Sequence, residues 1–178
     1  MGDPKKPRKK YDTSRFPWQT DTLQSELRLI GEYGLRNKKE FWRYRTMVSK
    51  FRGIARSLLG MSSAERRTRQ KQLLSRLRRL GVLSRGGELD DVLDLTTEEL
   101  LERRLQSLVF HRGLAKSMHQ ARQFIVHGHV AVGGKRVSSP GYLVSREEES
   151  EIDYAPNSPL SDSDHPVRES IGVEGEAA

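Results

Sequence analysis

The sequence has no cysteine among its 178 residues, and this absence excludes disulfide bonds and thiolate ligands for a metal ion. It also lacks any apolar run near the roughly 18 residues that a membrane-spanning helix requires. The N-terminus is basic and carries no apolar segment of the kind found in secretory signals. We therefore expect a cytoplasmic protein with no membrane partner.

Apolar residues are scarce in this chain. Hydrophobic residues make up 34% of the sequence and charged residues 31%. This balance is typical of small packed units with large solvated or partner-facing surfaces, and it disfavours a single thick core. The length suits one domain of ordinary size or two small ones.

The charge of the chain is divided into blocks. Residues 1–85 contain 23 Lys and Arg against 7 Asp and Glu, and residues 102–146 contain 8 against 1. Residues 86–101 contain six acids and no base, and residues 147–178 contain ten acids and one Arg. Two basic blocks separated by an acidic segment indicate two contact zones for a polyanion. An anionic membrane would instead favour one basic amphipathic helix with an open apolar face.

The first 20 residues form a basic segment interrupted by proline, without a helical or strand period. Such an arm is extended until it meets a polyanion. Its aromatic residues Tyr11, Phe16 and Trp18 either stack on nucleic-acid bases or anchor the arm to the protein body. We favour the anchor interpretation, because buried aromatic side chains are common and splayed bases are not.

Residues 21–87 are predicted to be an Arg-rich helical region. Apolar residues at steps of three and four predict helices over about 22–34, 37–60 and 62–81. The last of these has almost no acids to pair with its arginines, so its like charges repel one another. A solvated face is one interpretation, but a bound polyanion would relieve the repulsion, and we favour RNA contact. Residues 88–101 are predicted to be an acidic linker and the start of a helix.

Residues 102–154 change from a helical period to a period of two. A helix is predicted from Thr96 to about Phe110, and another from Ser117 to Gly128. Gly133-Gly134 lies between alternating apolar residues and predicts a β-hairpin.

Two further short strands are predicted at residues 143–144 and 152–154. The expected fold class is therefore α+β: a basic arm and a helical region, then a small helix-turn-helix with an antiparallel sheet. Residues 155–178 are predicted to be an acidic, flexible tail.

The second unit resembles the S-four RNA-binding module, a small helix-turn-sheet domain found in many RNA-binding proteins. The matching residues are Arg103-Arg104-Leu105-Gln106, Ala115-x-Ser117-x-x-x-Ala121-Arg122, His127-Gly128-His129-Val130-x-Val132-x-Gly134 and Pro140-x-Tyr142-Leu143-Val144. The match covers roughly residues 102–154 and implies RNA binding.

The N-terminal part resembles the small-subunit ribosomal protein S-four family in its archaeal form. The matching segments are residues 2–11, Pro17-Trp18, residues 33–40 and Arg56-x-Leu58-Leu59. The bacterial form often holds zinc through Cys ligands, which this chain lacks. The resemblance runs from about residue 2 to residue 154.

This resemblance implies a primary binder of small-subunit (16S-type) rRNA. The family binds a multi-helix junction in the 5′ domain of that rRNA and nucleates assembly of the subunit body. It lies beside the fifth small-subunit protein, near the path by which mRNA enters, and influences decoding accuracy. We expect a ribosome-bound protein with no enzymatic activity, no cofactor and no small-molecule substrate.

The candidate RNA-binding residues are the basic side chains of both blocks and the polar residues around the second predicted helix of the module. They are Lys5, Lys6, Arg8, Lys9, Lys10, Arg15, Arg36, Lys38, Lys39, Arg43, Arg45, Arg52, Arg56, Arg66, Arg67, Arg69, Arg103, Arg104, Arg112, Lys116, Ser117, His119, Gln120, Arg122, Gln123, His127, His129, Lys135 and Arg136.

Two kinds of site are set aside. His127 and His129 have no accompanying Asp, Glu or Cys cluster, so we expect no metal site. Ser117 and His119 face apart near a helix start and have no third group to orient the histidine, so we expect no catalytic pair. An RNA-modifying enzyme and a free regulator of an mRNA or a stalled large subunit remain as alternatives. The first 100 residues are too basic and too poor in apolar residues for a catalytic domain, and the long Arg-rich region favours ribosomal residence.

Overall fold

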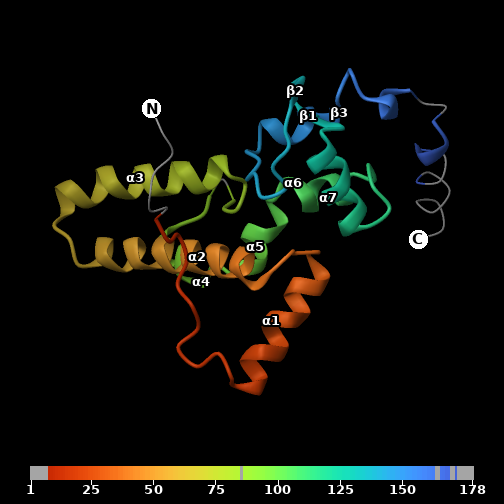
Figure 1. Ribbon diagram of the computed structural model, residues 1–178. Helices are drawn as coiled ribbons and strands as arrows, with labels where there is room; N and C mark the ends of the chain where they lie inside the picture. Colours follow the sequence, from red (N-terminus) through yellow and green to blue (C-terminus); the bar gives the residue numbers. More distant parts are fainter. Residues whose placement is uncertain (1–7, 85, 163–164, 169–170, 172–178) are drawn as a thin grey trace.

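The computed structural model describes residues 8–84, 86–162, 165–168 and 171, so the predictions for Lys5 and Lys6 lie outside the described residues. Figure 1 shows a helical unit followed by a smaller unit that contains the sheet. The predicted α+β fold class, with helices before a small antiparallel sheet, is confirmed. Within the described ranges, no helix is both long and apolar enough to cross a membrane.

The helical unit is built around a long antiparallel helix pair. α1 (Thr20–Glu32) leads into α2 (Lys38–Leu59), and α3 (Ser63–Arg79) returns alongside α2 (Figure 1). The Asn37 side chain accepts a hydrogen bond from the Glu40 backbone N–H at 3.1 Å and caps the start of α2. The apolar faces meet in one core, whose buried members from α2 and α3 are Phe41, Tyr44, Val48, Phe51, Ala55, Leu58, Leu73, Leu74 and Leu77.

The acidic segment forms two short helices, α4 (Leu89–Asp94) and α5 (Thr97–Glu102). Each is amphipathic: the apolar side chains, such as Val92 and Leu100, are fully buried against the core of the helical unit. Arg52 Nη2 also donates to the Leu95 carbonyl oxygen at 2.6 Å. Residues 88–101, predicted as a linker, therefore contribute to the core of the helical unit.

The single helix predicted from Thr96 to Phe110 is wrong, because it breaks at Arg103 and Arg104. α5 ends at Glu102 and α6 (Leu105–His111) begins afresh. The backbone N–H of Leu105 donates at 2.8 Å to the carbonyl oxygen of Tyr142, a distant part of the chain. The predicted strand at 143–144 is also wrong: Leu143 forms one isolated bridge with Arg104 and does not join the sheet.

The rest of the second unit follows its prediction. α7 (Met118–His127) ends at Gly128, whose φ of +80° suits glycine. β1 (Val130–Val132), β2 (Lys135–Arg136) and β3 (Ile152–Tyr154) form an antiparallel sheet in the order β2-β1-β3, which confirms the hairpin and the last strand. The short 3₁₀ helices η1 (Glu148–Glu151) and η2 (Pro159–Ser161) flank β3.

The beginning of the predicted tail packs against the second unit. Ala155 and Leu160 are buried, and the backbone N–H of Ala155 donates to the carbonyl oxygen of His129 at 2.8 Å. The Arg168 guanidinium lies 5.0 Å from the centre of the Tyr154 ring. These contacts place residues 155–162 on the sheet unit, in contrast to the flexible tail expected from the sequence.

Candidate RNA-binding surface

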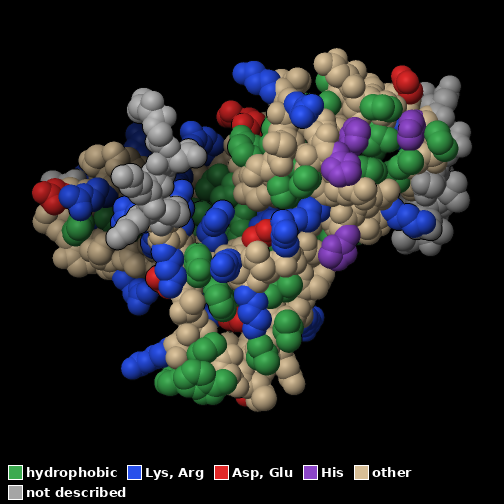
Figure 2. All heavy atoms as spheres, in the orientation of Figure 1, with side chains coloured by type: hydrophobic (Ala, Val, Ile, Leu, Met, Phe, Trp, Pro, Cys, Tyr) green, Lys and Arg blue, Asp and Glu red, His purple; other side chains and the backbone are tan. Residues whose placement is uncertain are grey.

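The surface of the helical unit is dominated by basic side chains. Figure 2 shows Lys and Arg side chains gathered over this unit, with few acidic side chains between them on the face in view. The predicted residues that are exposed there are Arg8, Lys9, Lys10, Arg15, Arg36, Lys39, Arg43, Arg45, Arg56, Arg67 and Arg69. Lys38, Arg52 and Arg66 are half-buried. The structure therefore leaves most of the predicted cations of this unit open to solvent, and their contact with RNA stays a prediction.

The aromatic residues of the arm divide into two groups. Tyr11 stacks on Trp42 of α2, with the ring centroids 6.0 Å apart, and the backbone N–H of Asp12 donates to the Thr46 hydroxyl at 2.9 Å. Trp18, in contrast, is 74% exposed. The anchor interpretation is confirmed for Tyr11 and wrong for Trp18 and for Phe16, which is 47% exposed. Anchoring at Tyr11 holds Lys9 and Lys10 beside α2.

The second unit carries its own exposed polar face. Ser117 accepts a hydrogen bond from the Gln120 backbone N–H at 3.2 Å and caps α7, as predicted. The predicted RNA-binding residues that are exposed in this unit are Arg112, Lys116, Ser117, His119, Gln123, His127, Lys135 and Arg136. They come from the turn before α7, from α7 and from the β1–β2 hairpin, so the fold brings them to one small domain.

Two predicted residues of this unit are held by neighbours. Arg112 Nη1 donates to the Ile152 carbonyl oxygen at 2.8 Å. His129 Nδ1 lies 2.8 Å from the Ser158 hydroxyl, beside a hollow of about 270 Å³. Among the described residues, no group of three or more His, Asp or Glu side chains is placed to hold a metal ion.

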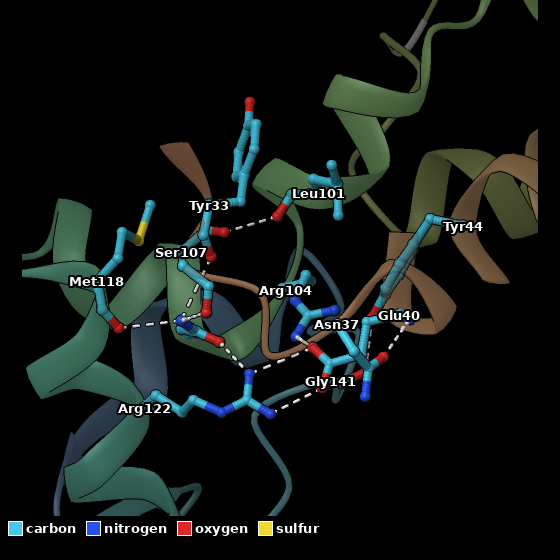
Figure 3. A network of polar contacts seen from close by, with 12 residues as sticks. Tyr33, Asn37, Glu40, Tyr44, Leu101, Arg104, Ser107, Met118, Arg122 and Gly141 are labelled. Atoms are coloured by element: carbon cyan, nitrogen blue, oxygen red, sulfur yellow. Dashed lines mark hydrogen bonds and ion pairs between the residues drawn. The ribbon is translucent and has the colours of Figure 1, made fainter. Parts of the chain in front are cut away.

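A partly buried ionic network joins the two units (Figure 3). Glu40 at the start of α2 accepts from Arg104 Nη2 at 3.0 Å and from Arg122 Nη2 at 2.7 Å. Arg122 Nη1 also donates to Gln106 Oε1 at 3.3 Å. The Gln106 amide nitrogen donates in turn to the carbonyl oxygens of Gly34 (3.0 Å) and Met118 (2.9 Å). One carboxylate and one amide thus connect α2 and the turn before it to α6 and α7.

Arg104 is a structural residue in this network. It is only 1% exposed, and its guanidinium lies 4.9 Å from the centre of the Tyr44 ring. The Tyr44 hydroxyl donates to the Gly141 carbonyl oxygen at 2.9 Å, which adds a second link between α2 and the second unit. Arg104 is therefore not part of the exposed basic surface, and its RNA contact stays a prediction. Arg103 is also largely internal, since it is paired with Glu149 at 2.8 Å and its side chain is 12% exposed.

The sequence pattern did not identify Glu40 as the link between the two units, because cations dominate the segment around it. A signal was present, since Glu40 is the only acid between Glu32 and Glu65 in a strongly basic segment. A lone carboxylate among so many bases is a natural partner for buried arginines from elsewhere in the fold.

Burial alone would raise the pKa of Glu40, but hydrogen bonds and charges from Arg122 and Arg104 outweigh it and hold the pKa below its ordinary value. A carboxyl group with a lowered pKa in the folded state stabilises the fold above its unfolded pKa. That contribution is lost as pH falls through the folded-state pKa, because the unfolded chain binds the proton more readily than the folded one and acid therefore favours unfolding.

We therefore predict an acid-dependent difference between the wild-type protein and Glu40→Gln. The wild type should be the more stable at pH 7, and the gap in unfolding free energy should shrink steadily as pH falls below about 4.5, near the reference carboxyl pKa. Denaturant unfolding at a series of pH values measures this. A gap that stays constant down to pH 3 would contradict the assignment of the charge pair.

Comparison with known proteins finds relatives that match both units of the chain. The S4 domain family matches residues 103–150. The chain is 53% identical over 161 residues to the small ribosomal subunit protein uS4 of Metallosphaera sedula, which covers 90% of this chain and 89% of that protein. It is 54% identical to the same protein of Hyperthermus butylicus (90% and 92% covered) and 50% identical to that of Methanothermobacter thermautotrophicus (90% and 94% covered). The similarity therefore spans the helical unit as well as the S4 domain.

Proposed function

The chain belongs to the uS4 family of small ribosomal subunit proteins, and we propose that it binds small-subunit rRNA through two basic surfaces held in a fixed relation. This membership confirms the resemblance inferred from the sequence. The proposed surfaces are the exposed cations of the helical unit and the exposed polar face of the S4 domain. In this role the chain is a structural, ribosome-bound component in the cytoplasm, and none of its residues is assigned a catalytic part.

The Glu40 network is the observation that carries the two-surface proposal. A folded rRNA presents phosphates in fixed directions, so two binding surfaces gain from being held rigidly before RNA arrives. Glu40, Arg104 and Arg122 supply that rigidity with charge-assisted hydrogen bonds between the units. Lys39 and Arg43 line a hollow of about 350 Å³ beside the network, which extends the basic surface across the junction.

The finer role follows from the family. We propose that the chain binds the 5′-domain junction of the rRNA early and nucleates the subunit body. Its position would lie beside the fifth small-subunit protein, near the path by which mRNA enters, where it would influence decoding accuracy. The long exposed basic surface supports this, because it needs a large RNA to neutralise it.

Sedimentation tests the residence of the chain. An epitope-tagged chain expressed in an archaeal host should co-sediment with small subunits and remain there after a high-salt wash, because its phosphate contacts are buried in the folded particle. A tagged full-length chain with Arg66→Gln/Arg67→Gln serves as the comparison and should wash off at lower salt. Recovery of the full chain only in the free fractions at low salt would contradict the proposal.

A further inference from the structure

A groove with an apolar floor runs between α2 and α3, the helix pair that lies side by side in Figure 1. One hollow of about 310 Å³ has Met47, Phe51 and Ile54 in its floor. A second, of about 330 Å³, has Phe51, Ile54 and Leu73. The two hollows share Phe51, Ile54 and Arg76, so they form one continuous groove. Each has many times the roughly 30 Å³ that one water molecule occupies.

Ile54 is the exposed part of this floor. It is 44% exposed, whereas its neighbours Phe51 and Ala55 on α2 are buried in the core. Its outward apolar surface contributes little to the stability of the free protein, since only burial from water stabilises. An apolar side chain left open at the bottom of a groove is suited to contact with a partner.

Among the residues that the structure describes, every charged side chain that lines the groove is basic. Lys10, Arg43 and Lys50 line the first hollow, Arg69 the second, and Arg76 both. The Arg76 guanidinium carbon also lies 5.5 Å from the centre of the Phe51 ring. The groove therefore combines apolar and cationic side chains, and its occupant should combine an apolar face with negative charge close to it.

We infer that the groove holds one unpaired base of the rRNA, stacked between Ile54 and the guanidinium of Arg76. A nucleotide joins a planar, largely apolar base to a phosphate on each side, and this matches the apolar and the cationic side chains at once. Lys10 and Lys50 are the cations placed to meet those phosphates. An RNA strand is favoured over an acidic protein segment because the same two helices carry the arginines assigned to rRNA. The inference thus rests on the proposed function.

Salt-dependent affinity separates stacking from charge. Ile54→Ser should weaken binding to a transcript of the small-subunit rRNA about 5- to 100-fold, because it removes the apolar side chain that the base would cover. The slope of log affinity against log salt should stay unchanged, because a stacked base releases no counterion. Leu27→Ser is the matched control, since Leu27 is 51% exposed on α1, outside the groove. Its affinity should stay within about twofold of the wild type.

Arg76→Lys provides a second variant that keeps the charge and removes the planar stacking surface. It should also weaken binding without changing the salt slope. Arg28→Lys on α1 is its control and should bind like the wild type, because Arg28 lies away from the groove and its side chain is 82% exposed. Comparable denaturant midpoints for all four variants would show that folding is intact.

The absence of cysteine allows the base to be located. Ile54→Cys carries the only thiol of the chain, and an iron chelate tethered to it should cleave the rRNA at one short stretch. Transcripts made abasic at each unpaired nucleotide of that stretch in turn should include one that binds the wild type about as weakly as the normal transcript binds Ile54→Ser. Ile54→Ser should bind this abasic transcript no more weakly than it binds the normal one, because the two changes remove the same contact.

Two results would overturn the inference: Ile54→Ser could bind the transcript as tightly as the wild type, or the abasic transcript could bind the wild type with unchanged affinity. In the first case, depletion of Ile54→Ser from assembled subunits would assign the groove to a neighbouring protein. A wild-type chain that does not bind the transcript would instead contradict the proposed function itself.

Discussion

Arg104→Ala is expected to lower the free energy of unfolding by about 3–5 kcal/mol, the usual loss when one partner of a buried ion pair is removed. The substitution leaves Glu40 with Arg122 alone, removes the contact with the Tyr44 ring and opens a cavity where a side chain was 1% exposed. Because the network joins the two units, the melting temperature of both should fall together. Denaturant unfolding followed by circular dichroism measures the change.

Arg67→Ala is the matched control for Arg104→Ala. Arg67 is exposed on α3, so its loss should change stability by no more than about 0.5 kcal/mol. Both variants should weaken RNA binding, Arg67→Ala by the loss of a surface cation and Arg104→Ala by the loss of the fixed relation between the two surfaces, but only Arg104→Ala should also lower stability. An Arg104→Ala protein as stable as Arg67→Ala would show that the buried network does not hold the units together.

The double variant Arg66→Gln/Arg67→Gln is expected to weaken rRNA binding about 10- to 100-fold, through the loss of two phosphate contacts. These residues lie in the first turns of α3, in a run of like charges with few acids to pair with. If each contacts one phosphate, the salt slope should fall by about 0.9 for each residue, or about 2 in all. Filter binding to a small-subunit rRNA transcript between 50 and 300 mM salt measures both quantities.

The same pair changed to lysine keeps the charge and separates electrostatics from side-chain shape. That variant should retain the wild-type salt slope. The glutamine variant should also be as stable as the wild type or slightly more so, because it relieves repulsion within α3. Unchanged affinity in the glutamine variant would favour the solvated-face interpretation of this helix.

Local sequence patterns predicted most of the helical unit and the hairpin. The apolar spacing along α2, the Asn37 cap and the glycine that ends α7 are all encoded within a few residues of where they act. Gly133 and Gly134 adopt φ values of +57° and +72°, which is the backbone conformation expected for the turn of a two-residue hairpin.

Contacts between distant segments account for the errors. The break between α5 and α6 depends on Tyr142, 37 residues beyond Leu105, and no local pattern announces it. Arg104 belongs to a basic pair that looked fit for RNA, yet Glu40, 64 residues earlier, holds it inside the protein. The burial of α4 was missed for a similar reason: its acidic face masked the apolar face that packs on α2.

The central claim, that this chain binds small-subunit rRNA by itself through two joined basic surfaces, is tested most directly by equilibrium binding to naked rRNA. The purified full-length chain would be titrated against full-length small-subunit rRNA and, in competition, against large-subunit rRNA over a range of salt. We predict tight binding to the small-subunit rRNA that survives excess large-subunit rRNA, with a steep linear fall of log affinity against log salt. Equal affinity for the two rRNAs, or binding only after other ribosomal proteins are added, would contradict the claim.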